Sequence, residues 1–174
     1  MIKGKTGSLK PIINGLRFES RTTLKNVISA IQGYEVKDDV VYFKGNKVAE
    51  LYQKNKLYKN LLEPQGVDYK KIISKRLLPD DAILILKDEI LFIIEIKFQE
   101  VSGSVDEKLQ TCDFKNQQYT KLLAPLNISV KYTYILNDWF KKDEYKDVLS
   151  FIKSVGCYYF FDELPFDFLG LPKP

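Results

Sequence analysis

The chain has 174 residues, of which 45% are hydrophobic, and this size is typical of one domain with a buried core. Its formal net charge is only +4 while 29% of its residues are charged, so any basic surface must be local, which is compatible with nucleic acid without implying it. The chain contains no histidine. This excludes His-dependent triads, His-ligated zinc and nucleases that use histidine as general base.

Cysteine content and hydropathy set the expected location. Cys112 and Cys157 are too few and too far apart for a metal knuckle, and each lies in an apolar run that suits a small buried residue. The first ten residues carry lysines but no apolar run, and no segment approaches eighteen uncharged apolar residues. We therefore expect no signal peptide, no membrane span and a cytoplasmic protein.

The first half of the chain predicts mainly helices. Residues 1–15 lack apolar periodicity and indicate a flexible basic arm that ends in a turn at Asn14-Gly15. Residues 18–32 repeat apolar side chains at helical spacing before Gly33, which predicts an amphipathic helix. The elements expected next are a hairpin of strands 34–36 and 40–43, a helix over 48–62 and a short helix over 67–74.

The second half predicts the centre of a sheet. Two β-rich apolar runs, 82–86 and 90–96, flank a polar turn and predict a buried hairpin. Ser104 and Glu107 are spaced as in a capping box, which predicts a helix from 104 to 123. The remaining expected elements are a strand over 129–136, a helix over 143–154 and a strand over 157–161. This order indicates an α/β fold, with a mixed central β-sheet flanked by helices, in a single domain spanning 1–174.

Charged residues lie at both ends of the segment that forms the central hairpin. Pro79-Asp80-Asp81 precedes its first strand, and Glu95-Ile96-Lys97 closes its second. Residues two apart on a strand share a face, so Glu95 and Lys97 point the same way. If the turn centres on residues 87 and 88, the strand register places Asp80 opposite Glu95. Two carboxylates and an amine then converge at one end of the sheet.

This convergence predicts metal-dependent phosphodiester chemistry. Asp80 and Glu95 can hold Mg²⁺ while leaving positions for water and a phosphate, and Lys97 can orient or deprotonate that water and stabilise the pentavalent phosphate. A Glu and a Lys two apart on a surface hairpin are usually just solvated. The buried run of residues 90–94 favours the catalytic interpretation, because two charges placed after it would be costly without a purpose.

The segments Leu78-Pro79-Asp80-Asp81-Ala82-Ile83 and Phe92-Ile93-Ile94-Glu95-Ile96-Lys97-Phe98-Gln99 resemble the PD-(D/E)XK nuclease superfamily, in particular type II restriction endonucleases with an E-x-K-x-Q element. The resemblance covers roughly residues 76–123. It implies that Asp80 and Glu95 are metal ligands, that Lys97 is the catalytic lysine, and that Gln99 supports the site. The doubled aspartate leaves Asp81 as an alternative ligand, because a three-residue turn would set it opposite Glu95 instead.

The resemblance also implies a possible further ligand and a DNA-contacting helix. Families of this kind often add a glutamate from the first helix, for which Glu19 is the candidate; its alternative role is to favour the helix dipole. The region 103–118 is similar to the loop and helix that meet DNA. Side chains able to contact bases or phosphates gather there, and they are Lys108, Gln110, Lys115, Asn116, Gln117 and Gln118. A solvated helix face would have the same composition.

The expected function is a Mg²⁺-dependent, sequence-specific endonuclease that cuts double-stranded DNA. Two-fold symmetry of a short DNA site is most simply matched by a homodimer. A junction-resolving or repair nuclease could share the site but recognise DNA shape. A noncatalytic nucleic-acid-binding domain is the alternative from another class, and the costly trio of Asp80, Glu95 and Lys97 argues against it.

Overall fold

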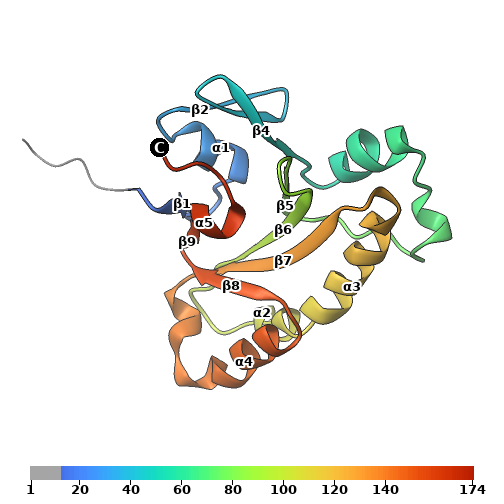
Figure 1. Cartoon of the computed structure of the whole chain (residues 1–174). Coiled ribbons are helices and arrows are strands. Elements are labelled where there is room, and N and C mark those ends of the chain that lie inside the picture. Colours follow the sequence, from blue (N-terminus) through green and yellow to red (C-terminus); the bar gives the residue numbers. More distant parts are fainter. Residues whose placement is uncertain (1–12) are drawn as a thin grey trace, which may run out of the picture.

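The computed structural model describes residues 13–174, apart from the side chain of Asp106, and is built on a seven-stranded mixed sheet flanked by helices (Figure 1). The expected mixed α/β class is confirmed. The strands, in their order across the sheet, are β2 (Tyr34–Lys37), β3 (Val40–Phe43), β4 (Asn46–Leu51), β5 (Asp81–Ile85), β6 (Ile90–Lys97), β7 (Ser129–Leu136) and β8 (Tyr158–Phe161). Strands β2 to β6 form an antiparallel meander, whereas β6, β7 and β8 run parallel.

Helices connect the parallel strands, as parallel pairing requires. The α-helices are α1 (Leu24–Ser29), α2 (Val105–Leu109), α3 (Cys112–Leu123), α4 (Lys146–Ser154) and α5 (Phe166–Leu169). A π-helical turn η1 (Leu57–Leu62) is accompanied by five 3₁₀ turns: η2 (Glu63–Gln65), η3 (Tyr69–Lys71), η4 (Ala124–Leu126), η5 (Asp138–Lys141) and η6 (Asp143–Tyr145). Within residues 13–174, no helix has the length and apolar character needed to cross a membrane.

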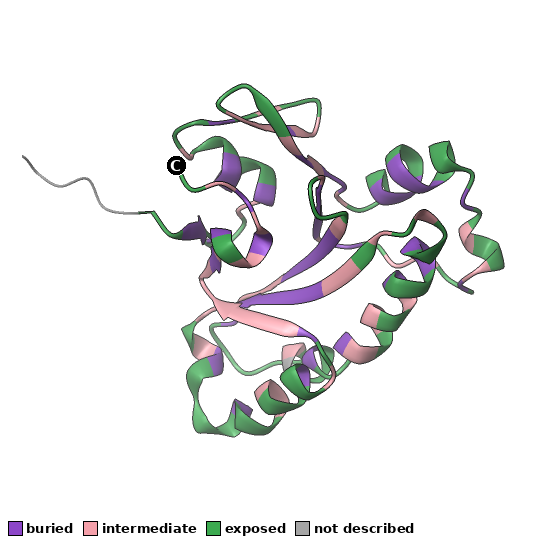
Figure 2. Ribbon diagram, viewed as in Figure 1, coloured by how far each residue is buried: buried purple, intermediate pink, exposed green. Residues whose placement is uncertain are grey.

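Side-chain alternation along β5 and β6 divides the core between the two faces of the sheet. Ala82 and Leu84 belong to one cluster, together with residues of η1, α3 and α4; we call this side the α3 face. Ile83 and Ile85 belong to the other cluster, with α1 and α5, on the α1 face. Strand β5, the middle of β6 and the second half of β7 are buried (Figure 2), so a charged side chain placed among them needs a partner.

The C-terminal segment closes the α1 face. Strand β9 (Glu163–Pro165) pairs with β1 (Gly15–Arg17) in a separate two-stranded sheet. A Cβ on Gly15 would lie 2.7 Å from the Leu164 carbonyl oxygen, so this close approach requires glycine. The turn expected at Asn14-Gly15 is therefore wrong, since Gly15 is already in a strand. Residues 1–12 of the expected basic arm lie outside the described residues.

Three helix predictions need correction. The helix expected over 48–62 is strand β4 followed by η1, because pairing of residues 46–51 with β3 and β5 overrides the helical spacing of Leu51, Leu57 and Leu61. The helix expected over 18–32 is reduced to α1. The helix expected over 104–123 is interrupted between α2 and α3, and the Ser104 side chain makes no capping hydrogen bond, so the capping box is absent.

The other predictions match the structure more closely. The hairpin over 34–43 and the strand over 129–136 are confirmed, the latter with its expected bounds. Residues 143–154 form a 3₁₀ turn followed by α4, and residues 67–74 form only the turn η3. Both cysteines are free and buried, as expected.

Candidate functional site

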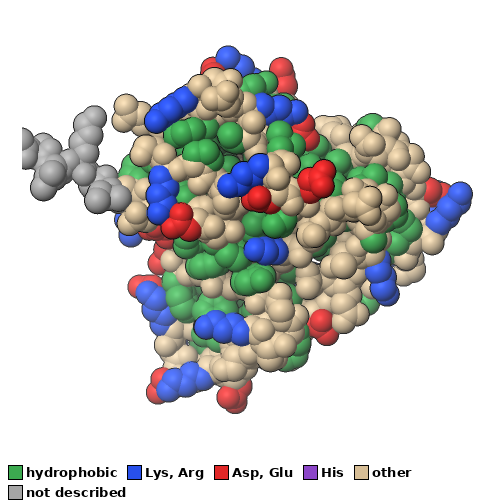
Figure 3. All heavy atoms as spheres, viewed as in Figure 1, with side chains coloured by type: hydrophobic (Ala, Val, Ile, Leu, Met, Phe, Trp, Pro, Cys, Tyr) green, Lys and Arg blue, Asp and Glu red, His purple; other side chains and the backbone are tan. Residues whose placement is uncertain are grey.

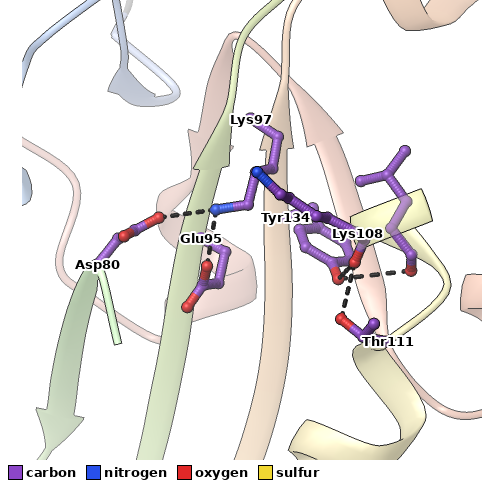
Figure 4. Close-up of polar contacts among 7 residues, drawn as sticks. Asp80, Glu95, Lys97, Lys108, Thr111 and Tyr134 are labelled. Carbon is purple, nitrogen blue, oxygen red and sulfur yellow. Dashed lines mark hydrogen bonds and ion pairs between the residues drawn. The ribbon is translucent and has the colours of Figure 1, made fainter. Parts of the chain in front are cut away.

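The predicted convergence of three charged side chains occurs at the open end of the β5–β6 hairpin. Strand pairing sets Ile85 opposite Ile90 and Asp81 opposite Ile94, so continuing the register by one residue brings Asp80 beside Glu95. The Lys97 Nζ atom lies 2.9 Å from Asp80 Oδ2 and 2.8 Å from Glu95 Oε2 (Figure 4). We call these three residues the carboxylate–lysine cluster. The strand register expected from the sequence is confirmed.

The cluster has a buried end and an open end. Glu95 is only 5% exposed, and burial raises its pKa against the opposing charges of Lys97 and Lys115. Burial alone would lower the pKa of Lys97, but its two carboxylate neighbours outweigh burial and raise it. The Asp80 side chain, in contrast, is 45% exposed. A ligand can therefore reach the cluster past Asp80, while Glu95 is held in a medium of low polarity where its charge interacts strongly.

Asp81 lies on the opposite face of the sheet from the cluster. Its Oδ2 atom accepts a hydrogen bond of 3.1 Å from the Leu24 backbone N–H, at the first residue of α1. Burial is the main reason that the pKa of Asp81 is raised to about 6. Of the two aspartates left open by the sequence, only Asp80 contacts Lys97 and shares a face with Glu95, and Asp81 anchors α1 instead.

Glu19 is not in the first helix. It lies in the loop before α1, and the N-cap of that helix is Thr23, whose side chain accepts a hydrogen bond of 3.3 Å from Asn26 N. Both roles considered for Glu19 assumed a place at the helix start, and the first turn of α1 contains no acidic residue. The Glu19 side chain instead lines a hollow bordered by β1, which does not include Asp80.

Gln99 continues the face of Glu95 and Lys97 beyond β6. Its backbone N–H donates to Asn137 Oδ1 at 3.2 Å, and the Asn137 side-chain amide donates to the Gln99 carbonyl oxygen at 2.8 Å. The Gln99 side chain is 7% exposed, and neither its oxygen nor its nitrogen has a partner among the described residues. A buried primary amide without partners is costly, so a ligand or water at this point would stabilise it.

Helices α2 and α3 are tied to the strand beside the cluster. Tyr134 pairs with Glu95 across the β6–β7 ladder, and its hydroxyl donates to the Lys108 carbonyl oxygen at 3.0 Å (Figure 4). Lys115 is half-buried, and its charge reaches Glu95. The two helices pack on the sheet through buried apolar side chains, among them Leu109, Cys112, Tyr119 and Leu122.

The residues proposed to contact DNA differ in exposure. Lys108, Gln110 and Gln117 are exposed, whereas Gln118 and Asn116 are half-buried. The Asn116 Oδ1 atom is buried without a partner among the described residues. The structure thus brings Lys115 towards the cluster and leaves Lys108, Gln110 and Gln117 facing solvent.

Four basic residues, Lys70, Lys71, Lys75 and Arg76, precede Asp80 in the chain. Arg76 packs its guanidinium over the rings of Tyr58 and Tyr69, at 4.9 and 4.6 Å from their centroids, and contacts Glu63 at 3.4 Å. These contacts give Arg76 a structural role. Lys70, Lys71 and Lys75 are exposed.

The donor set suits a hard cation. Asp80 and Glu95 each place an oxygen within hydrogen-bond distance of one ammonium group, so a single cation can contact both. Oxygen ligands are those that Mg²⁺ prefers, and it commonly takes only one or two carboxylates besides water and phosphate. Among residues 13–174 no group of three or more Cys, Asp or Glu is arranged as a metal site, so a site here would rest on these two.

Two positioning residues were missed by sequence reasoning. Asn137 directly follows β7 and clamps the end of β6, and Tyr134 fastens α2. Asn137 could have been found as a polar residue at the carboxyl end of a strand parallel to β6, where functional side chains gather. The Tyr134 contact carried no signal, since an alternating aromatic residue in a strand also fits an ordinary core.

No family model, curated protein or solved structure matches this chain.

Proposed function

We propose that this protein is a Mg²⁺-dependent endonuclease of the PD-(D/E)XK type that hydrolyses phosphodiester bonds of double-stranded DNA, on a restriction-endonuclease-like fold. The supporting observation is the carboxylate–lysine cluster at the open end of β5 and β6. Two carboxylates and a lysine converge there, and one carboxylate is almost fully buried. A structural role alone would not require three charges at this cost, because apolar residues of similar size stabilise a fold as well or better.

Each residue of the cluster would have a distinct task. Asp80 and Glu95 would hold the Mg²⁺ ion, which when bound neutralises phosphate charge and makes water more acidic. Lys97 would orient the attacking water and donate a hydrogen bond to the phosphate as negative charge grows in the transition state. Its raised pKa favours the protonated, donating form. The side-chain amide of Gln99, which has no partner among the described residues, is available to position a water molecule beside Lys97.

The substrate preference rests on α2 and α3. These helices pack next to the strand that flanks Glu95, and they present Lys108, Gln110 and Gln118, side chains that can contact phosphates or base edges. We therefore favour a sequence-specific enzyme of the type II restriction class, acting as a homodimer on a two-fold symmetric site. On the face shown in Figure 3, Lys and Arg side chains are scattered among acidic residues. DNA binding would therefore depend on individual side chains such as those of α2 and α3.

Plasmid cleavage tests the proposal. The protein is incubated with supercoiled plasmid in Mg²⁺ and, as a control, in EDTA. A sequence-specific enzyme produces discrete linear fragments only in Mg²⁺. Random degradation would replace this function with that of a nonspecific nuclease, and cutting confined to branched substrates would favour the junction-resolving alternative. DNA binding without cutting under any divalent metal ion would favour the noncatalytic alternative and overturn the proposal.

A further inference from the structure

A second hollow shares Asp80 with the carboxylate–lysine cluster. Its volume is about 350 Å³. We call it the Asp80 hollow, and it is lined by the turn 20–23, the turn 53–54, the pair Asp80 and Asp81, and the apolar side chains of Ile96 and Phe98. A phosphate group with water fits such a space. Most of its lining, including Asp81, Ile96 and Phe98, belongs to the α1 face, whereas Asp80 borders both the hollow and the cluster. A group bound here would therefore lie around the end of the hairpin from the reacting phosphate.

Two cations from separate segments are held at this hollow. Lys54 donates its backbone N–H to the Pro79 carbonyl oxygen at 3.1 Å, which fixes the 53–54 turn against the residue before Asp80. Arg21 belongs to the turn just before α1, and Asp81 anchors the first residue of that helix. Asp80 therefore belongs to the cluster, while Asp81, on the other face of the sheet, holds the start of the helix that follows the Arg21 turn.

Both cations are available to an anion. Among the described residues, neither Arg21 nor Lys54 lies within ion-pair distance of a carboxylate. Lys25 and Lys56, which belong to neighbouring segments, are both paired with Asp39. The hydroxyl-bearing residues Ser20 and Thr23 also line the hollow and offer further donors, whereas the Thr22 hydroxyl already donates to the Glu19 carbonyl oxygen at 2.8 Å. An arginine, a lysine and hydroxyl groups form a donor set that phosphate oxygens accept.

We propose that the Asp80 hollow binds the DNA backbone phosphate next to the scissile one, with Arg21 and Lys54 as its ligands. This inference rests on the proposed function, since it needs DNA at the cluster. Successive phosphates are linked along one strand, so holding the neighbouring phosphate fixes the scissile phosphate against Asp80 and Lys97. Such a contact positions the substrate and is independent of base sequence.

Salt-dependent DNA binding by the full chain tests the proposal. Affinity for a labelled duplex is measured by fluorescence anisotropy in EDTA, where no cutting occurs, over a range of salt concentrations. Arg21→Gln and Lys54→Gln should each weaken binding roughly fivefold at low salt and reduce the slope of log affinity against log salt by about one. The loss should be equal for all duplex sequences. Arg21→Lys and Lys54→Arg keep the charge and should retain most of the affinity.

A matched control is Lys44→Gln. Lys44 and Lys54 share a left-handed backbone, each with a φ of 48°, but Lys44 does not line the hollow. Its replacement should leave the slope unchanged. If the wild-type protein cuts DNA but Arg21→Gln and Lys54→Gln bind DNA with the wild-type affinity and salt dependence, the phosphate site is refuted while the proposed function stands. If the wild-type protein neither binds nor cuts DNA, the proposed function fails and this inference fails with it.

Discussion

Asp80 and Asp81 are adjacent in the chain, yet they belong to opposite faces of the sheet. Asp80 contacts Lys97 on the α3 face and is half-exposed, whereas Asp81 is buried on the α1 face and binds the backbone of α1. One carboxylate is open to a ligand and the other is already satisfied by the protein. The difference arises from the two-residue period of a strand, which sends neighbouring side chains to opposite sides.

The comparison separates chemistry from architecture within one segment. A carboxylate that joins another carboxylate and a lysine is suited to catalysis, while a carboxylate that accepts a backbone N–H at a helix start is suited to stability. Loss of a catalytic group should therefore abolish cleavage without unfolding the protein. Loss of the architectural group should lower the free energy of unfolding and leave the chemistry of folded molecules largely intact.

The largest effect is expected from the buried part of the cluster. Lys97→Ala and Glu95→Gln should each reduce the rate of DNA cleavage in Mg²⁺ by about a thousandfold or more, equivalent to about 4 kcal/mol of transition-state stabilisation. DNA binding should change little, because phosphate contacts elsewhere supply most of the affinity. Single-turnover cleavage and anisotropy titrations measure the two quantities. If Lys97→Ala cleaved DNA at the wild-type rate, the assignment of Lys97 as a catalytic residue would be refuted.

A smaller effect is expected from the helices that cover the cluster's face. Gln118→Ala should cost about 1 to 3 kcal/mol of discrimination at a single base position if this residue reads a base. Lys108→Ala should instead weaken binding to all sequences alike, because a lysine–phosphate contact is independent of sequence. Cleavage of a set of single-base site variants, at fixed salt, measures both. Unchanged base preferences in every α2 and α3 variant would exclude these helices as readers.

On the α1 face, Asp81→Ala should lower the free energy of unfolding by about 1 to 2 kcal/mol. The substitution removes the acceptor of the Leu24 N–H and leaves that buried donor without a partner. Urea denaturation followed by circular dichroism measures the change. A stability equal to that of the wild type would show that Asp81 does not anchor α1.

The smallest effect is expected from Asp39, an architectural carboxylate nearer the surface. It bridges Lys25 of α1, at 3.3 Å, and Lys56, at 2.5 Å. Burial raises the pKa of Asp39, but hydrogen bonds from the two lysines outweigh burial and hold the pKa below its ordinary value. Its stabilisation is therefore present above the ordinary aspartate pKa and is lost as the pH falls through the lower, folded-state value.

Asp39→Asn tests this sign. The substitution should lower the free energy of unfolding by about 0.5 kcal/mol or less at neutral pH, because the lysines are half-exposed. At an acid pH below the folded-state pKa, where both states of the wild type are protonated, the difference should vanish. Thermal unfolding at the two pH values measures it. A difference in stability that grows towards acid pH would contradict a lowered pKa of Asp39 in the folded protein.

Sequence periodicity predicted the parts of the molecule that depend on local patterns. The central hairpin, its register and the convergence of Asp80, Glu95 and Lys97 follow from alternating runs and a short turn. The strand β4 could not be recognised, because Leu51 at its end is spaced from Leu57 and Leu61 as in a helix, and only pairing with its two neighbouring strands selects the strand. Local spacing is informative where the tertiary environment agrees with it.

Contacts between distant segments were beyond the reach of the sequence. Asn137 and Gln99 are 38 residues apart, and Asp81 and Leu24 are 57 apart, so no local spacing reveals either pair. The choice between Asp80 and Asp81 depended on the length of the turn between β5 and β6, which the amino-acid sequence alone did not determine. The Arg21 and Lys54 pair was missed for the same reason, since its members meet only after β4 pairs with β5.

Single-turnover DNA cleavage by Asp80→Asn and Asp81→Asn tests the central claim most directly. The two substitutions are chemically identical and lie one residue apart, but they fall on opposite faces of the sheet, one half-exposed and one buried. Rates are measured in Mg²⁺ at equal concentrations of folded protein, with folding checked by circular dichroism. The structure predicts that Asp80→Asn loses cleavage by about a thousandfold while Asp81→Asn stays within about tenfold of the wild type. An inactive Asp81→Asn alongside a fully active Asp80→Asn would contradict the account.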